Sequence, residues 1–176
     1  ILFKTFGGVD AFPICLATQD IEEIIATGMA IWPTFGGICL SSIMSPRCFT
    51  VADHLARAVN VPVLHAEQHA MAAAILGGLY NALKLVGKAK EDVRVVINGA
   101  GPGGIGVAEL LLRTGFQHIL ICDRLGILYR YRAYHMNWAK LDISRRTNHA
   151  DVTGTLSDAV RNADVLIGLS SWNTVT

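Results

Sequence analysis

The stretch that decides the fold is VRVVINGAGPGGIGVAELLLRTGFQHILICD, residues 93–123. It opens with the β-type run 93–97, which is apolar except for Arg94 and is typical of a strand. A glycine-rich loop follows, and residues 105–112 then place apolar side chains at helical spacing. A second apolar run, 119–122, ends at Asp123. The stretch therefore predicts a strand, a helix and a second, parallel strand, which together form one βαβ unit.

The loop of this unit has the pattern G-x-G-x-x-G at Gly99, Gly101 and Gly104. Gly99 permits a tight turn, Gly101 lets the backbone approach a pyrophosphate, and Gly104 allows the helix to pack closely on the strand. The amide groups at the start of the helix would then face the phosphates. Asp123 lies 19 positions after Gly104, where an acidic residue contacts the adenosine ribose. The stretch therefore predicts a dinucleotide-binding site.

The cofactor could be NAD or NADP. Asp123 favours NAD, because its carboxylate can accept hydrogen bonds from the ribose hydroxyls, whereas Arg124 could bind a 2′-phosphate. Ser170 follows the apolar run 165–169, and we expect it near the nicotinamide ribose, because open α/β sheets bind ligands where their strands end. In the alternative interpretation, the glycine-rich turn merely joins strand to helix and Asp123 is an ordinary turn residue. The predicted cofactor-binding residues are Gly99, Gly101, Pro102, Gly103, Gly104, Ile105, Asp123, Arg124 and Ser170.

The chain before residue 90 also alternates short apolar runs with helical patterns. The polar linker 88–92 then predicts a domain boundary near residue 90. We expect an α/β chain with a Rossmann-like, doubly wound, mostly parallel sheet over 91–176, incomplete at its C-terminal end, after part of a second α/β substrate domain over 1–90. In that first part we expect strands at 11–16, 38–40 and 61–64, and helices capped by Asp20, over about 46–59, and over about 68–86 with Gly87 at the end.

Composition and charge argue against several classes of partner. The 176 residues are 52% hydrophobic and 16% charged, which suits a parallel sheet covered on both faces. A net charge of +1 without a basic run argues against nucleic acid and anionic lipid. Apolar stretches such as 71–79 fall short of the roughly 20 residues of a membrane span, so we expect no membrane segment. The four cysteines form no C-x-x-C pair, which predicts reduced, buried thiols and a cytoplasmic location.

Several phrases of the chain resemble those of bacterial-type malic enzymes. They are FGGVDAFPI at 6–14, PTFGGI at 33–38, PRCF at 46–49, NALKLVGK at 81–88 and NGAG at 98–101. The resemblance implies an oligomeric enzyme, expected to be a homo-oligomer, that converts the small molecule malate to pyruvate and carbon dioxide with NAD or NADP and with Mg or Mn. It places the catalytic lysine of the family just before Ile1, so no catalytic residue is assigned here. The chain is interpreted as an internal piece of a longer protein.

The chain departs from this family at the metal site that the resemblance implies. Ser41 and Ser42 replace a Glu-Asp pair, and Ala66 with Glu67 replaces an Asp-Asp pair, so that Glu67 is the one metal-binding carboxylate left. One carboxylate with two hydroxyls would bind Mg²⁺ or Mn²⁺ far more weakly than three carboxylates. Glu67 is the predicted metal ligand, and a solvated carboxylate at the start of a helix is the alternative.

One further interpretation of the metal site and two hypotheses of function stay open. The pattern H-x-E-x-H at His65, Glu67 and His69 suggests zinc, although a strand-to-helix junction is expected between the histidines, so that they need not share one face. The missing carboxylates leave two hypotheses of function. One is a malic-enzyme-like oxidoreductase impaired by the loss of metal ligands, and the other is a catalytically silent, regulatory or structural dinucleotide-binding homologue.

Overall fold

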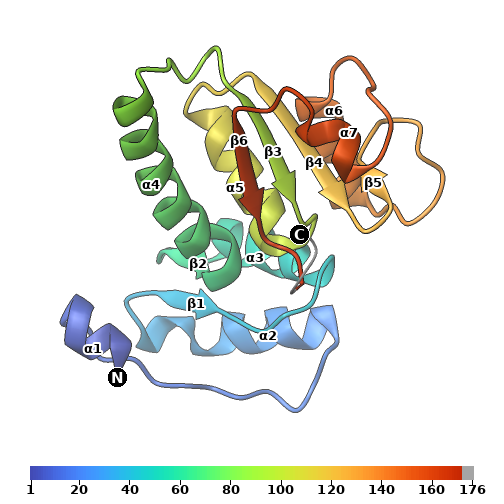
Figure 1. The fold of residues 1–176 in the computed structure, drawn as a ribbon. Helices are drawn as coiled ribbons and strands as arrows, with labels where there is room; N and C mark the ends of the chain where they lie inside the picture. Colours follow the sequence, from blue (N-terminus) through green and yellow to red (C-terminus); the bar gives the residue numbers. More distant parts are fainter. Residues whose placement is uncertain (172–176) are drawn as a thin grey trace.

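The structure is a computed structural model that describes residues 1–171, and in this part of the chain a smaller and a larger β-sheet are joined by helices (Figure 1). The elements follow the predicted alternation of strands and helices. In chain order they are α1 (Leu2–Gly7), α2 (Ile21–Ile31), a 3₁₀ turn (Trp32–Thr34), β1 (Ile38–Leu40), α3 (Arg47–Ala58), β2 (Val63–His65), a π-helical turn (Ala66–Ala70), α4 (Met71–Val86), β3 (Arg94–Asn98), α5 (Pro102–Arg113), β4 (His118–Asp123), β5 (Gly126–Ile127), α6 (Trp138–Thr147), α7 (Leu156–Val160) and β6 (Val165–Gly168).

The larger sheet has the strand order β5-β4-β3-β6. β3 pairs in parallel with β4 on one side and with β6 on the other, and β5 is antiparallel to β4. The chain therefore leaves β3 in one direction through α5 and later returns to its other side, which makes the carboxyl end of β3 a topological switch point. In Figure 1 the arrowheads of β3, β4 and β6 point the same way, toward α3 and the smaller sheet. The predicted Rossmann-like, doubly wound and mostly parallel sheet is confirmed.

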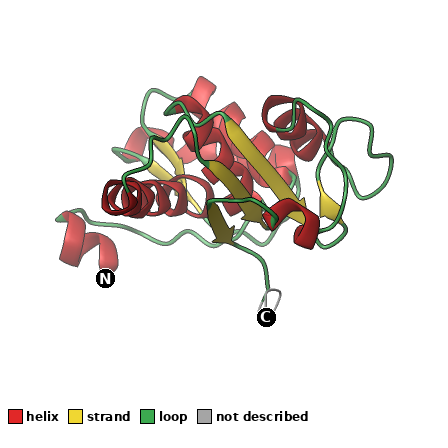
Figure 2. Ribbon diagram, turned by 45° about the horizontal axis from the view of Figure 1, so that its top comes forward, coloured by secondary structure: helices red, strands yellow, loops and turns green. Residues whose placement is uncertain are grey.

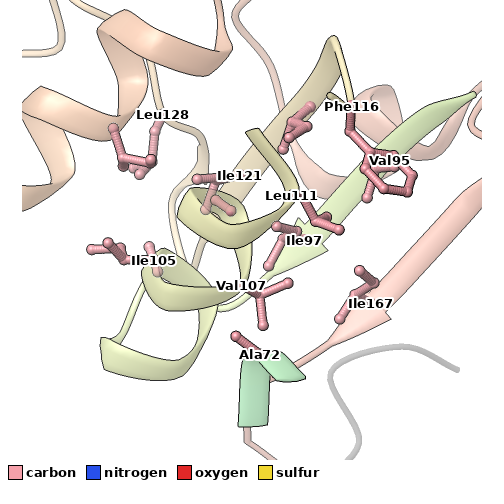
Figure 3. Close-up of a cluster of buried hydrophobic side chains, with 14 of the residues drawn as sticks. Ala72, Val95, Ile97, Ile105, Val107, Leu111, Phe116, Ile121, Leu128 and Ile167 are labelled. Carbon is pink, nitrogen blue, oxygen red and sulfur yellow. The ribbon is translucent and has the colours of Figure 1, made fainter. Parts of the chain in front are cut away.

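Alternate side chains of β3 enter two different cores. Val95 and Ile97 belong to the main core with residues of α4 and α5, many of which Figure 3 shows. Val96 instead packs with Cys122, Ile127 and other residues toward α7. Because side chains alternate along a strand, the apolar residues Val95, Val96 and Ile97 in the middle of β3 require cover on both faces. Figure 2 shows helices on both sides of the larger sheet.

The main core includes residues from both sides of the predicted boundary near residue 90. Cys48 of α3 and Ala72, Leu79 and Leu83 of α4 share one buried cluster with the strands of the larger sheet. Figure 3 shows Ala72 beside the α5 residues of this cluster. The segments α3 and α4 are therefore built into the packing of the larger sheet.

The smaller sheet pairs β1 with β2 in parallel and packs on α2 and α3. Asp20 caps α2 as predicted, because its side chain accepts a hydrogen bond of 3.0 Å from the Glu23 amide. Helices α2 and α3 approach closely where Gly28 faces Leu55, since a Cβ on Gly28 would lie 2.9 Å from a Leu55 methyl group. This arrangement holds the ends of β1 and β2 in place below the larger sheet.

Two local predictions are wrong. Residues 11–16 form no strand; they are an exposed irregular segment in which Phe12 is 72% exposed. A strand needs a neighbour for its amides and carbonyls, and Pro13 also lacks an amide hydrogen. The expected burial of the thiols holds for Cys48 and Cys122, whereas Cys15 and Cys39 are exposed; all four are free.

The expectation about membrane segments also changes. The π-helical turn and α4 join into one helical stretch, Ala66–Val86, whose 21 residues and mean hydropathy of 1.2 could cross a membrane by length and composition alone. A single helix of this kind is weak evidence, because core helices pass the same test. In this structure Ala72, Leu79 and Leu83 of the helix are buried in the main core, whereas only 17% of its apolar window is buried in all.

Candidate functional site

The glycine-rich loop between β3 and α5 is tightly packed at two of its glycines. Gly99 has a φ of 129°, and a Cβ there would lie 2.5 Å from the carbonyl oxygen of Leu169 after β6. A Cβ on Gly104 would lie 1.7 Å from the carbonyl oxygen of Gly99. Glycine is therefore required at both positions, and it brings the end of β6 and the first turn of α5 against the loop.

The start of α5 is less crowded than Gly99 and Gly104. It has open space, and its first amides come before the first hydrogen bond of the helix. A Cβ on Gly101 would meet nothing within 4 Å. The first helical hydrogen bond of α5 runs from the Ile105 amide to the Gly101 carbonyl, at 3.0 Å, so the amides of Gly103 and Gly104 come before it. Pro102, the first residue of α5, contributes no amide hydrogen. The Ile105 side chain is buried in the core beneath the loop.

A groove of about 420 Å³ lies where β3, β4 and β6 end. It brings together five of the predicted cofactor-binding residues from three separate parts of the chain. Pro102, Gly103, Gly104 and Ile105 lie at the start of α5, beside this lining. The groove is lined by Gly99, Ala100, Gly101, Asp123, Arg124, His135, Lys140, Leu169, Ser170 and Ser171.

Asp123 lies at the end of β4 and is held by two cations. Its Oδ2 accepts hydrogen bonds from the Arg132 guanidinium and, at 2.7 Å, from Lys140 Nζ. Burial by itself raises the pKa of Asp123, but these hydrogen bonds outweigh burial and lower the pKa from 3.8 to about 2. The carboxylate is therefore ionised at neutral pH and fixed in orientation.

Sequence reasoning missed Arg132, Lys140 and His135. Arg132 and Lys140 lie 9 and 17 positions after Asp123, and no motif links these positions. One signal in the sequence is Asn137, because asparagine is a common helix-capping residue. Asn137 does cap α6, because its Oδ1 accepts a hydrogen bond of 2.9 Å from the Lys140 amide. This cap places Lys140 in the first turn of α6, on the side of the groove.

Glu67 lies in a second polar cluster, at the π-helical turn after β2. Its Oε1 accepts hydrogen bonds of 3.2 Å from Ser41 Oγ and from the Ser42 amide. Burial tends to raise the pKa of Glu67, but the hydrogen bond from the Ser42 amide is the main cause that holds it below its usual value. His65 is fully buried, its Nδ1 lies 3.2 Å from Glu67 Oε2, and burial lowers its pKa. Glu67 is thus a hydrogen-bonded carboxylate beside a neutral imidazole.

The donors of this cluster do not fit a hard divalent cation. Mg²⁺ and Mn²⁺ need several carboxylate oxygens, and here a single carboxylate faces the Ser41 hydroxyl and the Ser42 amide. The zinc interpretation is not supported either. His69 Nδ1 accepts a hydrogen bond of 2.9 Å from the His65 amide, so this nitrogen is already occupied. Across residues 1–171, no group of three or more His, Cys, Asp or Glu side chains is arranged to hold a metal ion.

A glycine-rich turn at a helix mouth, an acidic strand end and a groove at the switch point together define a dinucleotide-binding domain of the Rossmann type. The chain belongs to the malic enzyme family, since the family model described as malic enzyme, NAD binding domain, matches residues 69–175. The matched region begins in the π-helical turn before α4, which agrees with the packing of α4 in the main core.

Known proteins of this family are similar over the whole chain. The chain is 45% identical to an NAD-dependent malic enzyme of Geobacillus stearothermophilus over 97% of its length, and 43% identical to a bifunctional malic/malolactic enzyme of Bacillus subtilis over 100%. The crystal structure of an NAD-dependent malic enzyme from Thermotoga maritima superposes on 99% of the chain with a TM-score of 0.95 and 39% identity. The chain spans 36%, 43% and 47% of the length of these three proteins, respectively.

Proposed function

We propose that this chain is the NAD(P)-binding part of a malic-enzyme-like oxidoreductase, which converts malate to pyruvate and carbon dioxide. The observation that supports this proposal is the groove at the switch point, where Gly101, Asp123 and Ser170 meet in a chain of the malic enzyme family. NAD or NADP, when bound, supplies the hydride acceptor that oxidises the hydroxyl carbon of the substrate.

Each part of the groove has a proposed task in holding the cofactor. The diphosphate lies over Gly101, within reach of the amides of Gly103 and Gly104 at the positive end of α5. Asp123 and Arg124 contact the adenosine ribose, and Ser170 lies near the nicotinamide ribose. The open space over Gly101 supports this placement, because a side chain there would take up the room of a phosphate.

We propose that turnover by this chain is impaired. The family resemblance expects carboxylates at positions 41, 42 and 66, where the chain has Ser41, Ser42 and Ala66. Glu67 Oε1 already accepts hydrogen bonds from both serines, so only the buried Oε2 of the one remaining carboxylate lacks a hydrogen-bond partner and is left for a cation. The same observation favours a second candidate, a catalytically silent homologue that binds the dinucleotide in a regulatory or structural subunit.

Partners and location follow the same proposal. The molecule acts on a small dicarboxylic acid in the cytoplasm, and its near-neutral net charge of +1 gives no electrostatic reason for a nucleic acid partner. We further propose a homo-oligomer. Phe6 and Phe12 are 83% and 72% exposed in this chain, and such apolar side chains suit contact with another protein surface.

Binding and turnover test the proposal separately. Calorimetry of the full chain with NAD and with NADP should show binding, and failure of both cofactors to bind would overturn the proposal. In the protein that contains this chain, malate-dependent NADH or NADPH formation with Mn²⁺ should be near background. It should rise after the combined changes Ser41→Glu, Ser42→Asp and Ala66→Asp. Rapid turnover of the unchanged protein would contradict the impairment, and no gain in the triple variant would favour the silent homologue.

A further inference from the structure

A second cavity, of about 380 Å³, lies at the end of α4, away from the cofactor groove. Its lining residues all fall between positions 80 and 90, on the last turns of α4 and in the linker that follows, and none of them lines the cofactor groove. In Figure 1 the end of α4 and the linker lie at the top, whereas the arrowheads of the strands point the opposite way. The cavity is therefore at the other end of β3, whose five residues span roughly 15 Å.

Three lysines line this cavity, and in the described chain no acidic residue lines it. Lys88 Nζ pairs with one carboxylate oxygen of Asp164, and the other oxygen accepts a hydrogen bond of 2.8 Å from the Arg94 amide. Lys90 Nζ donates at 2.7 Å to the carbonyl oxygen of Thr114, in the turn after α5. Contacts with segments outside α4 thus hold two of the three amines beside the cavity.

Lys84 is the third cation and has a different environment. Among residues 1–171 its amine makes no hydrogen bond and no ion pair. The negative end of α4 attracts a lysine in the last turn, and Asp164 and Glu91 offset part of the charge of Lys88 and Lys90. The Lys84 charge has no such carboxylate partner, so the cavity has an excess of positive charge.

The rest of the cavity surface is apolar and held in place by packing. Leu83 is buried in the main core, and the ring of Tyr80 packs on Phe116 with ring centroids 6.2 Å apart. The amine of Lys90 lies close to the turn after α5, because a Cβ on Gly115 would be 3.3 Å from it. Fixed cations beside an apolar surface suit a ligand with an anionic end and an apolar body.

We propose that this cavity binds a small organic monophosphate, with the phosphate at the three lysine amines and an aromatic or aliphatic body against Tyr80 and Leu83. A phosphate suits the three cations better than a carboxylate does, because it carries up to two negative charges near neutral pH and offers three acceptor oxygens. Lysine binds phosphate as a point charge, so no bidentate geometry is required. The site is separate from the cofactor groove, and its ligand would bind whether or not the chain oxidises malate.

Calorimetry of the full chain with phenyl phosphate gives the first test. The titration is made in saturating NAD and repeated in Gly101→Ala, because the glycine-rich loop is itself a place where phosphates bind. Phenyl phosphate should bind at one site under both conditions. It should bind at least about tenfold more tightly than inorganic phosphate or benzoate, since it alone offers both the dianion and the ring.

Each other outcome of this titration counts against the cavity. Absence of binding, or binding that NAD displaces, would overturn the proposed site. Equal affinity for phenyl phosphate and benzoate would contradict recognition of a phosphate, and equal affinity for phenyl phosphate and inorganic phosphate would contradict the role of Tyr80 and Leu83. Binding of phenyl phosphate in a chain that binds neither NAD nor NADP would support the cavity and still overturn the proposed function.

Lys84→Met gives the second test, with Lys4→Met as the matched control, because Lys4 is an exposed lysine of α1 outside the cavity. Lys84→Met should weaken phenyl phosphate binding about tenfold, since one charge-assisted hydrogen bond is lost. Its melting temperature should stay within about 3 °C of the unchanged chain, as expected for an exposed side chain. Lys84→Arg should retain most of the affinity. Unchanged affinity in Lys84→Met, or an equal loss in Lys4→Met, would overturn the assignment of Lys84 to this site.

Discussion

The carbonyl oxygen of Gly99 occupies the space that a Cβ atom on Gly104 would need, with only 1.7 Å between the two positions. The obstacle is backbone, so it cannot be relieved by a side-chain rotation. We expect Gly104→Ala to lower the free energy of unfolding by about 1–3 kcal/mol, as overpacking does, and to abolish binding of NAD and NADP. Urea denaturation and calorimetry would measure both effects. A variant with unchanged stability and affinity would contradict the close approach of α5 to the loop.

Gly101→Ala separates cofactor binding from folding in the same loop. The added methyl group meets no protein atom within 4 Å, and the residue has a φ of −88°, which alanine adopts freely. We expect a melting temperature within about 2 °C of the unchanged chain and a loss of cofactor affinity of at least about tenfold, because the methyl group enters the proposed phosphate space. Full retention of NAD affinity would place the diphosphate elsewhere.

The ion pairs of Asp123 should make folding sensitive to acid. The folded-state pKa is about 2 and the unfolded value is 3.8, so the pairing stabilises the fold fully above about pH 5 and loses its contribution as the pH falls toward 2. The lowered pKa corresponds to about 2 kcal/mol. In Asp123→Asn, the free energy of unfolding should therefore fall less between pH 6 and pH 3 than in the unchanged chain. If the free energy of unfolding fell by the same amount between pH 6 and pH 3 in both proteins, the ion pairs of Asp123 would contribute nothing to stability.

The cap of α6 gives a prediction of stability alone. Asn137 Oδ1 accepts a hydrogen bond from the Lys140 amide. Removal of the Asn137 side chain leaves this amide, in the first turn of α6, without its partner. We expect Asn137→Ala to cost about 1 kcal/mol in the free energy of unfolding, measured in urea. Asn137→Ser should retain most of that stability, because serine caps helices about as well as asparagine. Equal losses in both variants would mean that the side chain acts in some other way.

Helix α5 and the π-helical turn touch at Gly106. A Cβ there would lie 2.7 Å from the carbonyl oxygen and 2.8 Å from the Cα of Gln68. We expect Gly106→Ala to destabilise the chain by about 1–3 kcal/mol in urea denaturation. Gly77→Ala on α4 is the matched control: its methyl group meets nothing within 4 Å, and it should stabilise the helix by about 0.5–1 kcal/mol. If both substitutions changed the free energy of unfolding in the same direction, the contact between α5 and the π-helical turn would be contradicted.

The sequence predicted the fold well where local patterns decide it. The loop after β3, the cap at Asp20 and the alternation of strands with helices all follow from residues a few positions apart. The segment 11–16 shows the limit, because an apolar run becomes a strand only when another strand pairs with it. The π-helical turn Ala66–Ala70 was also missed; it packs closely against α5 at Gly106, a contact between segments that lie far apart in the sequence.

The candidate site was likewise predicted only in part from the sequence. The groove gathers Gly99, Gly101, Asp123, Arg124 and Ser170, which spacing and strand ends had pointed to. The partners of Asp123 could not be predicted in this way. Arg132 and Lys140 reach it from the segment after β5 and from α6, so their roles depend on how the chain folds back rather than on any spacing.

The buried cluster that α4 shares with the larger sheet affects how the chain would respond to cleavage. A protease cut at Lys90 in the linker 88–92 would sever the backbone without removing Leu79 and Leu83 from their apolar surroundings. The two fragments should remain associated until denaturant separates them, and residues 91–176 made alone should aggregate through the bare face that α4 normally covers.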